Sequence, residues 1–176
     1  KYYHTFCCYY LHLCGSFVNH NNDQTNMRIA MKFEGIYTPI ITPHTEDGSI
    51  NRDAFVEVVE FLISSGVHCI VVGASTGEYY AQTNEERIEL MNIASEVVNH
   101  RTLMMVGTGA IRTQDSVIFA LEAKKAGADC LLVNSPPYAV PRELENAKHA
   151  LQINQAANLP IMLYNYPGRT GTHMGE

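Results

Sequence analysis

No stretch of the 176 residues approaches the ~20 consecutive apolar residues that a membrane-spanning helix requires, so we expect no membrane span. The sequence also lacks an excess of basic residues, because 12 Lys and Arg stand against 18 Asp and Glu and the formal net charge is −6. A nucleic-acid partner is therefore not expected. The five cysteines and eight histidines lack the spacing of metal ligands, and we expect no bound metal.

A Gly-x-Gly-x-x-Gly motif is also missing after the first apolar run, which argues against a dinucleotide cofactor. What the sequence does contain is a regular series of short apolar runs. Each run is continuously apolar rather than alternating, which is typical of strands that are covered on both faces in a parallel sheet. The predicted strands begin near Ile36, Ile70, Leu103, Leu131 and Ile161.

Four stretches with apolar residues at helical spacing lie between these runs. Thr83 and Glu86 form a predicted capping box at the start of the second stretch. Strands that alternate with helices indicate the α/β class. The four apolar stripes consist of Phe55, Val58, Val59, Leu62 and Ile63; of Leu90, Ile93, Ala94 and Val97; of Val117, Ala120 and Leu121; and of Leu144, Ala147 and Leu151.

Two α/β architectures fit this pattern: an open, doubly wound sheet and a TIM (β/α)8 barrel. The polar residues that follow several of the predicted strands favour the barrel. The active-site residues of a barrel come from the carboxyl ends of several strands, whereas the site of a doubly wound sheet lies at one switch point. A barrel needs about 250 residues, so we expect one truncated after about the fifth strand. The polar residues at predicted strand ends are Thr42, Ser75, Thr76, Thr108, Ser135 and Tyr164.

The N-terminal segment lacks the strand and helix pattern of the rest of the sequence. Residues 1–31 show neither a helical nor a strand period, and we interpret them as a disordered or non-native leader. Residues 6–18 resemble a short signal segment, but they contain His12, and neither a basic cluster nor a clear cleavage site accompanies them. We therefore expect a cytoplasmic protein whose residues 32–176 form the N-terminal part of a single barrel domain.

Three predicted loops carry side chains that could transfer protons or bind a carboxylate. Ser75 and Thr76 place two hydroxyls in a glycine-flanked loop that suits a carboxylate or a relayed proton. Taken alone, this loop is more typical of an ordinary turn with a helix-capping hydroxyl. Tyr138 follows two prolines and could be a surface residue of a rigid loop. Tyr164 could be a rim residue, and Arg169 either a solvated charge or a bidentate carboxylate ligand.

Taken together, these loops resemble those of one family, the dihydrodipicolinate synthase/N-acetylneuraminate lyase group of Schiff-base aldolases. The resemblance rests on Gly-Ala-Ser-Thr-Gly-Glu at residues 73–78, Ser-Pro-Pro-Tyr at 135–138 and Tyr-Asn-Tyr-Pro-Gly-Arg-Thr-Gly at 164–171. The opening Gly-Ile-Tyr-Thr-Pro-Ile-Ile-Thr-Pro at 35–43 and Gly-Thr-Gly-Ala at 107–110 extend it over residues 33–176. Within this family, the sequence most resembles the dihydrodipicolinate synthase branch.

The resemblance implies a barrel enzyme in which a lysine on the sixth strand forms a Schiff base with pyruvate, without a separate cofactor. It assigns Tyr164 to proton transfer beside that lysine and Ser75 to the proton relay. Thr76 would help to hold the pyruvate carboxylate, and Arg169 would bind the carboxylate of aspartate semialdehyde, a substrate of lysine biosynthesis. Tyr138 would complete the relay from a neighbouring subunit of a homodimer or homotetramer.

Several residues depart from the synthase pattern. Ser75 stands where threonine is usual, Pro137 replaces a common aromatic residue, and Tyr79 and Tyr80 are bulkier than expected. Because of these departures, a second hypothesis also fits the sequence: another 2-keto acid aldolase or dehydratase of the same family. Arg169 argues for an aldehyde that carries a carboxylate and against sialic acid.

The Schiff-base lysine is the largest departure. Two of the five lysines, Lys1 and Lys32, precede the first predicted strand. The other three lie on predicted helices: Lys124, Lys125 and Lys148. We therefore expect the nucleophile beyond residue 176 and an inactive chain as given. The alternative is a non-catalytic binding or regulatory remnant, but its unpaired, apolar edge strands would favour aggregation.

Overall fold

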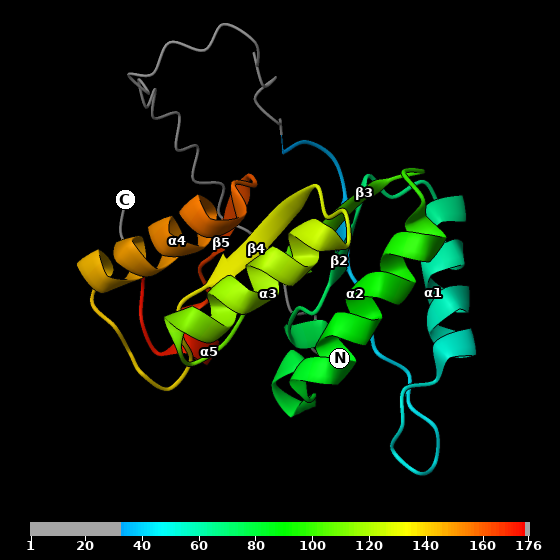
Figure 1. Cartoon of the computed structure of the whole chain (residues 1–176), viewed down its shortest axis with the longest axis horizontal. Coiled ribbons are helices and arrows are strands. Elements are labelled where there is room, and N and C mark those ends of the chain that lie inside the picture. Colours follow the sequence, from blue (N-terminus) through cyan, green and yellow to red (C-terminus); the bar gives the residue numbers. More distant parts are fainter. Residues whose placement is uncertain (1–32, 175–176) are drawn as a thin grey trace, which may run out of the picture.

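Strands and helices alternate throughout residues 33–174, the part of the chain that the computed structural model describes (Figure 1). The five predicted strands are confirmed, each beginning within one residue of its predicted start. They are β1 (Tyr37–Pro39), β2 (Cys69–Val72), β3 (Leu103–Gly107), β4 (Cys130–Asn134) and β5 (Ile161–Tyr164). The helices are α1 (Arg52–Ser64), α2 (Asn84–Val98), α3 (Thr113–Lys125), α4 (Glu143–Ala157) and the short α5 (Pro167–Thr170).

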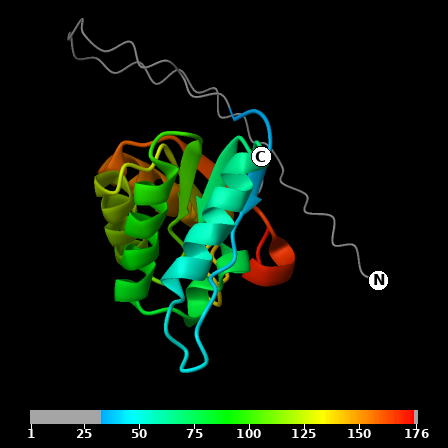
Figure 2. The ribbon, with the colours of Figure 1, turned by 90° about the vertical axis from the view of Figure 1, so that its right-hand side faces the viewer.

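The sheet is parallel throughout, and its strands lie in the order of the sequence, from β1 to β5. Helices α1 to α4 all lie on one face of it (Figures 1 and 2). A doubly wound sheet would carry helices on both faces and would reverse its strand order at a switch point. Neither feature is present in the described residues, so the arrangement is the curled wall of a barrel.

Successive strand residues contribute to two different cores, as expected of strands buried on both faces. Ile70, Val72 and Met104 belong to the large core between the sheet and the helices. Cys69 and Cys130 lie in a smaller core on the opposite face, with Val71, Ala74 and Met105. Both cysteines are free and fully buried, as expected of small core residues.

Local signals at the helix starts agree with the structure. The Thr83 side chain accepts a hydrogen bond from the backbone N–H of Glu86, and the Glu86 carboxylate accepts one from the backbone N–H of Thr83. The predicted capping box is therefore confirmed. At the start of α1, Asn51 accepts a hydrogen bond from the backbone N–H of Ala54.

The buried faces of α3 and α4 correct the sequence prediction. On α3, Ala120 is buried as predicted, but Phe119 and Ala123 accompany it, while Leu121 lies towards solvent. On α4 the predicted stripe is wrong: Leu144 is 66% exposed, and Ala147 and Leu151 are also exposed. Two polar residues, Asn146 and His149, lie inside instead, on the face of α4 that packs against α3, and His149 hydrogen-bonds to Thr113 of α3. The buried residues of α4 are Asn146, His149, Ala150, Ile153 and Ala157.

Candidate active site

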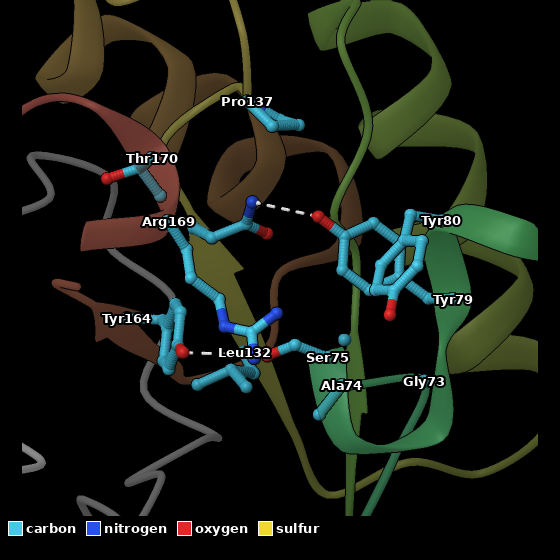
Figure 3. A pocket seen from close by; sticks show the side chains of 12 residues that line it. Gly73, Ala74, Ser75, Tyr79, Tyr80, Leu132, Pro137, Tyr164, Arg169 and Thr170 are labelled. Atoms are coloured by element: carbon cyan, nitrogen blue, oxygen red, sulfur yellow. Dashed lines mark hydrogen bonds between the residues drawn. The ribbon is translucent and has the colours of Figure 1, made fainter. Parts of the chain in front are cut away.

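A cavity of about 350 Å³ lies at the carboxyl ends of the strands. Parallel neighbouring strands bring the loops that follow them to one end of the sheet, so residues far apart in the sequence meet here. Ser75 comes from the loop after β2, Tyr164 from the end of β5 and Arg169 from α5 (Figure 3). Asn134, at the end of β4, also lines the cavity.

The loop after β2 is held in place by its backbone. Gly107 packs so closely that a Cβ atom on it would lie 2.2 Å from the carbonyl oxygen of Gly73, so no other residue fits there without movement of the backbone. Thr42 Oγ1 and Gln82 Nε2 both donate to the carbonyl oxygen of Gly77, at 2.9 and 2.7 Å. The loop that carries Ser75 is therefore fixed relative to the strand ends.

Ser75 and Tyr164, two of the predicted catalytic residues, face each other across the cavity. Their hydroxyl oxygens are 3.5 Å apart, which is longer than an ordinary O–H···O hydrogen bond (Figure 3). Catalytic hydrogen bonds are often long in the absence of substrate. The separation is short enough for a proton to pass between the two hydroxyls after a small movement.

Arg169, the predicted carboxylate ligand, also lines the cavity and directs its guanidinium group towards Tyr164 and Ser75 (Figure 3). Its side chain appears in none of the ion pairs found among residues 33–174. A guanidinium group in this position can bind a carboxylate through two parallel hydrogen bonds. One end of the cavity is thus polar and suited to an acid.

Two predicted site residues do not line the cavity. Thr76 is half-buried in the turn of residues 75–77. Tyr138 is 92% exposed on the loop between β4 and α4. A single copy of the chain therefore does not bring Tyr138 to Ser75, and the proposed entry of Tyr138 into a neighbouring subunit stays a prediction.

Sequence reasoning gave no site role to Tyr79, although its ring forms one wall of the cavity (Figure 3). Its hydroxyl oxygen lies 3.5 Å from Asn134 Nδ2, which donates to it. Burial raises the pKa of the Tyr79 phenol, so this group stays protonated well above neutral pH. The only signal in the sequence was the unexpected bulk of Tyr79 and Tyr80.

Arg87 packs against the Tyr79 ring, and sequence reasoning gave it no site role either. It is 5% exposed, and its guanidinium group donates to the carbonyl oxygens of Gly109 and Gly107 at 2.8 and 3.1 Å. The guanidinium carbon lies 3.5 Å from the ring centroid of Phe119 and 5.1 Å from that of Tyr79. Burial lowers the pKa of Arg87 to about 10, so it remains charged at neutral pH. A charged residue on the apolar stripe of α2 was the available signal.

Neither a metal centre nor a membrane segment emerges from residues 33–174. Within that range, His, Cys, Asp and Glu side chains form no group of three or more that could hold a metal ion. None of the helices described there has the length and apolar character needed to cross a membrane.

The fold and the site define the class of protein: a (β/α)8-barrel protein with its polar groups gathered at the carboxyl ends of the strands. A sequence model of the Dihydrodipicolinate synthetase family matches residues 32–176. The chain belongs to this family.

Individual relatives agree. The chain is 40% identical over 140 residues to 4-hydroxy-tetrahydrodipicolinate synthase from Salinibacter ruber, and 36% identical over 144 residues to that from Protochlamydia amoebophila. These matches cover 80% and 82% of this chain but 46% and 48% of the relatives. The chain thus spans about half the length of the curated relatives that it matches.

Solved structures show the same coverage. The 4-hydroxy-tetrahydrodipicolinate synthase from Methylacidiphilum fumariolicum SolV superposes with a TM-score of 0.79 at 35% identity, over 82% of this chain and 48% of that chain. A chloride-inhibited dihydrodipicolinate synthase from Acinetobacter baumannii, complexed with pyruvate, gives a TM-score of 0.79 at 33% identity, over 82% and 50%. Residues 33–174 therefore form the first part of a TIM (β/α)8 barrel.

Proposed function

We propose that this chain supplies part of the active site of an enzyme that condenses pyruvate with aspartate semialdehyde, through a Schiff base on a lysine beyond residue 176. The observation that carries the proposal is the meeting of Ser75, Tyr164 and Arg169 in one cavity at the strand ends. The names of the relatives support the same reaction.

The proposed chemistry needs protons to move at several steps. The lysine amine adds to the keto carbon of pyruvate, and water leaves as the imine forms. The methyl carbon then loses a proton and attacks the aldehyde carbon, and the new alkoxide takes up a proton. Tyr164 would deliver and remove these protons, with Ser75 as its relay partner at 3.5 Å.

The two substrates would be held by different groups. Thr76 does not line the cavity in the described residues, so its hydroxyl and backbone N–H would help to hold the pyruvate carboxylate only after a small shift of its turn, while Arg169 would bind the carboxylate of the aldehyde. Tyr138 would complete the relay in a neighbouring subunit of a homodimer or homotetramer. Its exposure in the single chain supports this assignment. We further propose that the complete enzyme acts in the cytoplasm, in lysine biosynthesis.

The lysines of the described residues do not provide the nucleophile. Lys124 and Lys125 lie on α3 and Lys148 on α4; all three are exposed to solvent, and none lines the cavity. Lys1 and Lys32 lie outside the described residues. We therefore propose that residues 1–176 alone do not catalyse the reaction.

Borohydride trapping tests this proposal. A protein that continues through the sixth strand should gain a pyruvate-derived adduct on reduction, whereas residues 1–176 should gain none, as read by peptide mass spectrometry. An adduct on Lys124, Lys125 or Lys148 of the short chain would overturn the site assignment. Absence of an adduct from the extended protein would favour a non-catalytic binding or regulatory role.

A second candidate is another 2-keto acid aldolase or dehydratase of the same family. The observation that favours it is the aromatic wall of Tyr79 and Tyr80, which lines the cavity opposite Arg169 (Figure 3). A panel of aldehydes, with and without a carboxylate, distinguishes the candidates. If the enzyme condenses pyruvate with aspartate semialdehyde, as proposed above, kcat/KM should be highest with aspartate semialdehyde.

A further inference from the structure

The segment that carries Arg169 is a closed loop with little stability of its own. Asn165 receives a hydrogen bond from the backbone N–H of Met174 at 3.1 Å and donates one to its carbonyl oxygen at 3.0 Å. This pair closes the base of residues 166–173, which we call the Arg169 loop. Its only helix, α5, has four residues, too few to be stable in isolation. The position of Arg169 therefore depends on what the Arg169 loop contacts.

The neighbouring loop, residues 135–142 between β4 and α4, has an unusual backbone. Tyr138 and Val140 both adopt positive φ angles, of 70° and 46°. This region is unfavourable for residues with a side chain, and most of all for a β-branched residue such as Val140. Such a conformation persists only where surrounding contacts hold it, and it is found most often at functional sites.

The Arg169 loop lies against the Val140 side chain, which is otherwise 54% exposed. A Cβ atom on Gly171 would lie 3.2 Å from Val140 Cγ2, which shows how closely the two residues approach. Beside them, Thr172 Oγ1 donates to the carbonyl oxygen of Pro141 at 3.0 Å. The strained loop that presents Tyr138 is thus fastened to the loop that presents Arg169.

We propose that Val140 is a positioning residue that fixes Arg169 and Tyr138 relative to each other through its contact with Gly171. The proposal rests on the proposed function, because these two residues bind and react only if that function holds. Val140 itself does not line the cavity, so it acts through the residues on either side of the contact.

The strain gives the proposal a distinctive signature. Glycine adopts positive φ angles without steric cost, so a loop that served structure alone would be more stable with glycine at position 140. Val140→Gly should leave the thermal midpoint unchanged or raise it, while it loosens the Arg169 loop. A residue with a merely structural role would not separate stability from function in this way.

Hydrogen exchange tests the contact directly. The backbone N–H groups of Arg169 and Thr170 both bond to the carbonyl of Tyr166, and that of Gly171 bonds to the carbonyl of Pro167. Val140→Gly should speed their exchange at least about tenfold, because fewer contacts then oppose local opening. Thr172→Val, which removes the hydrogen bond to Pro141 at similar volume, should act in the same direction.

His100→Gly is the matched control. His100 also has a positive φ angle, of 60°, but it lies between α2 and β3, at the opposite end of the strands from the cavity. The control should leave the exchange of residues 169–171 unchanged. Unchanged exchange in Val140→Gly, or equal acceleration in His100→Gly, would overturn the proposal.

Kinetics of the extended protein separate this proposal from the proposed function. Val140→Gly should raise KM for the carboxylated aldehyde and lower kcat, each by about tenfold to a hundredfold, since small displacements of positioned groups cost that much. The pyruvate adduct should still form and be trapped by borohydride, because the variant keeps the lysine. If exchange accelerates but both kinetic constants stay at the parent values, the contact is structural and the proposal fails. If the parent protein forms no pyruvate adduct, the proposed function fails, and hydrogen exchange still decides whether Val140 holds the Arg169 loop.

Discussion

At the scale of single residues, Tyr164 is the clearest test of the proposed chemistry. Its ring packs 6.1 Å from that of Tyr166, a contact that phenylalanine would keep. Tyr164→Phe in the extended protein should therefore preserve the fold but lower turnover by about 10²–10⁴, the usual contribution of one positioned proton-transfer group. Steady-state kinetics together with a thermal melt would check this. Turnover within a factor of two of the parent would remove Tyr164 from the mechanism.

Arg169 should give a different result, although it lies on the same short segment. Arg169→Ala should chiefly raise KM for the carboxylated aldehyde, roughly tenfold to a hundredfold, because a charge-assisted contact is worth about 1.5–3 kcal/mol. KM for pyruvate should change less. Arg112→Ala, which removes the exposed arginine at the N-cap of α3, is the control. If the kinetics with the aldehyde stay unchanged, a Schiff-base lyase for aldehydes without a carboxylate becomes the better hypothesis.

At the scale of secondary-structure elements, the joint between α3 and α4 should make stability depend on pH. His149 of α4 is buried, and its Nδ1 atom lies 2.9 Å from Thr113 Oγ1 of α3. Burial lowers the pKa of His149, so the folded protein favours the neutral imidazole. As pH falls below about 6.5, the unfolded chain takes up this proton first and folding loses stability.

The loss should have a slope of at most about 1.4 kcal/mol per pH unit for one proton, and it should end once the folded protein is also protonated. Denaturant titrations between pH 5 and 8 would measure it. His149→Gln should flatten this part of the profile, whereas His100→Gln, which removes an exposed histidine, should not. Equal slopes in all three proteins would show that another group controls the pH dependence.

At the scale of the whole molecule, we predict that residues 1–30 contribute to neither folding nor activity. These residues lie outside the described part of the chain, and the family match begins at residue 32. Deleting them from the extended protein should leave its thermal midpoint and turnover unchanged. A loss of several degrees would show that they pack on the barrel, because about 1 kcal/mol shifts the midpoint of a domain of this size by about 2–4 °C.

The sequence by itself determined the class of fold and most of its elements. Continuous apolar runs such as Ile70 to Val72 must be buried on both faces, and the capping box of Thr83 and Glu86 is a local interaction, so both follow from residues close together in the chain. The motifs at the strand ends also led to Ser75, Tyr164 and Arg169, which the structure places in one cavity.

Only the tertiary structure decided which face of α4 is buried and what forms the aromatic wall. Leu144 and Leu151 are exposed while His149 is buried, because contacts with α3, rather than hydrophobicity alone, select the face. The support of Tyr79 by Arg87 and Asn134 likewise joins three separate elements. Such contacts have no local signature, since they depend on how whole elements pack and not on the spacing of residues within any one of them.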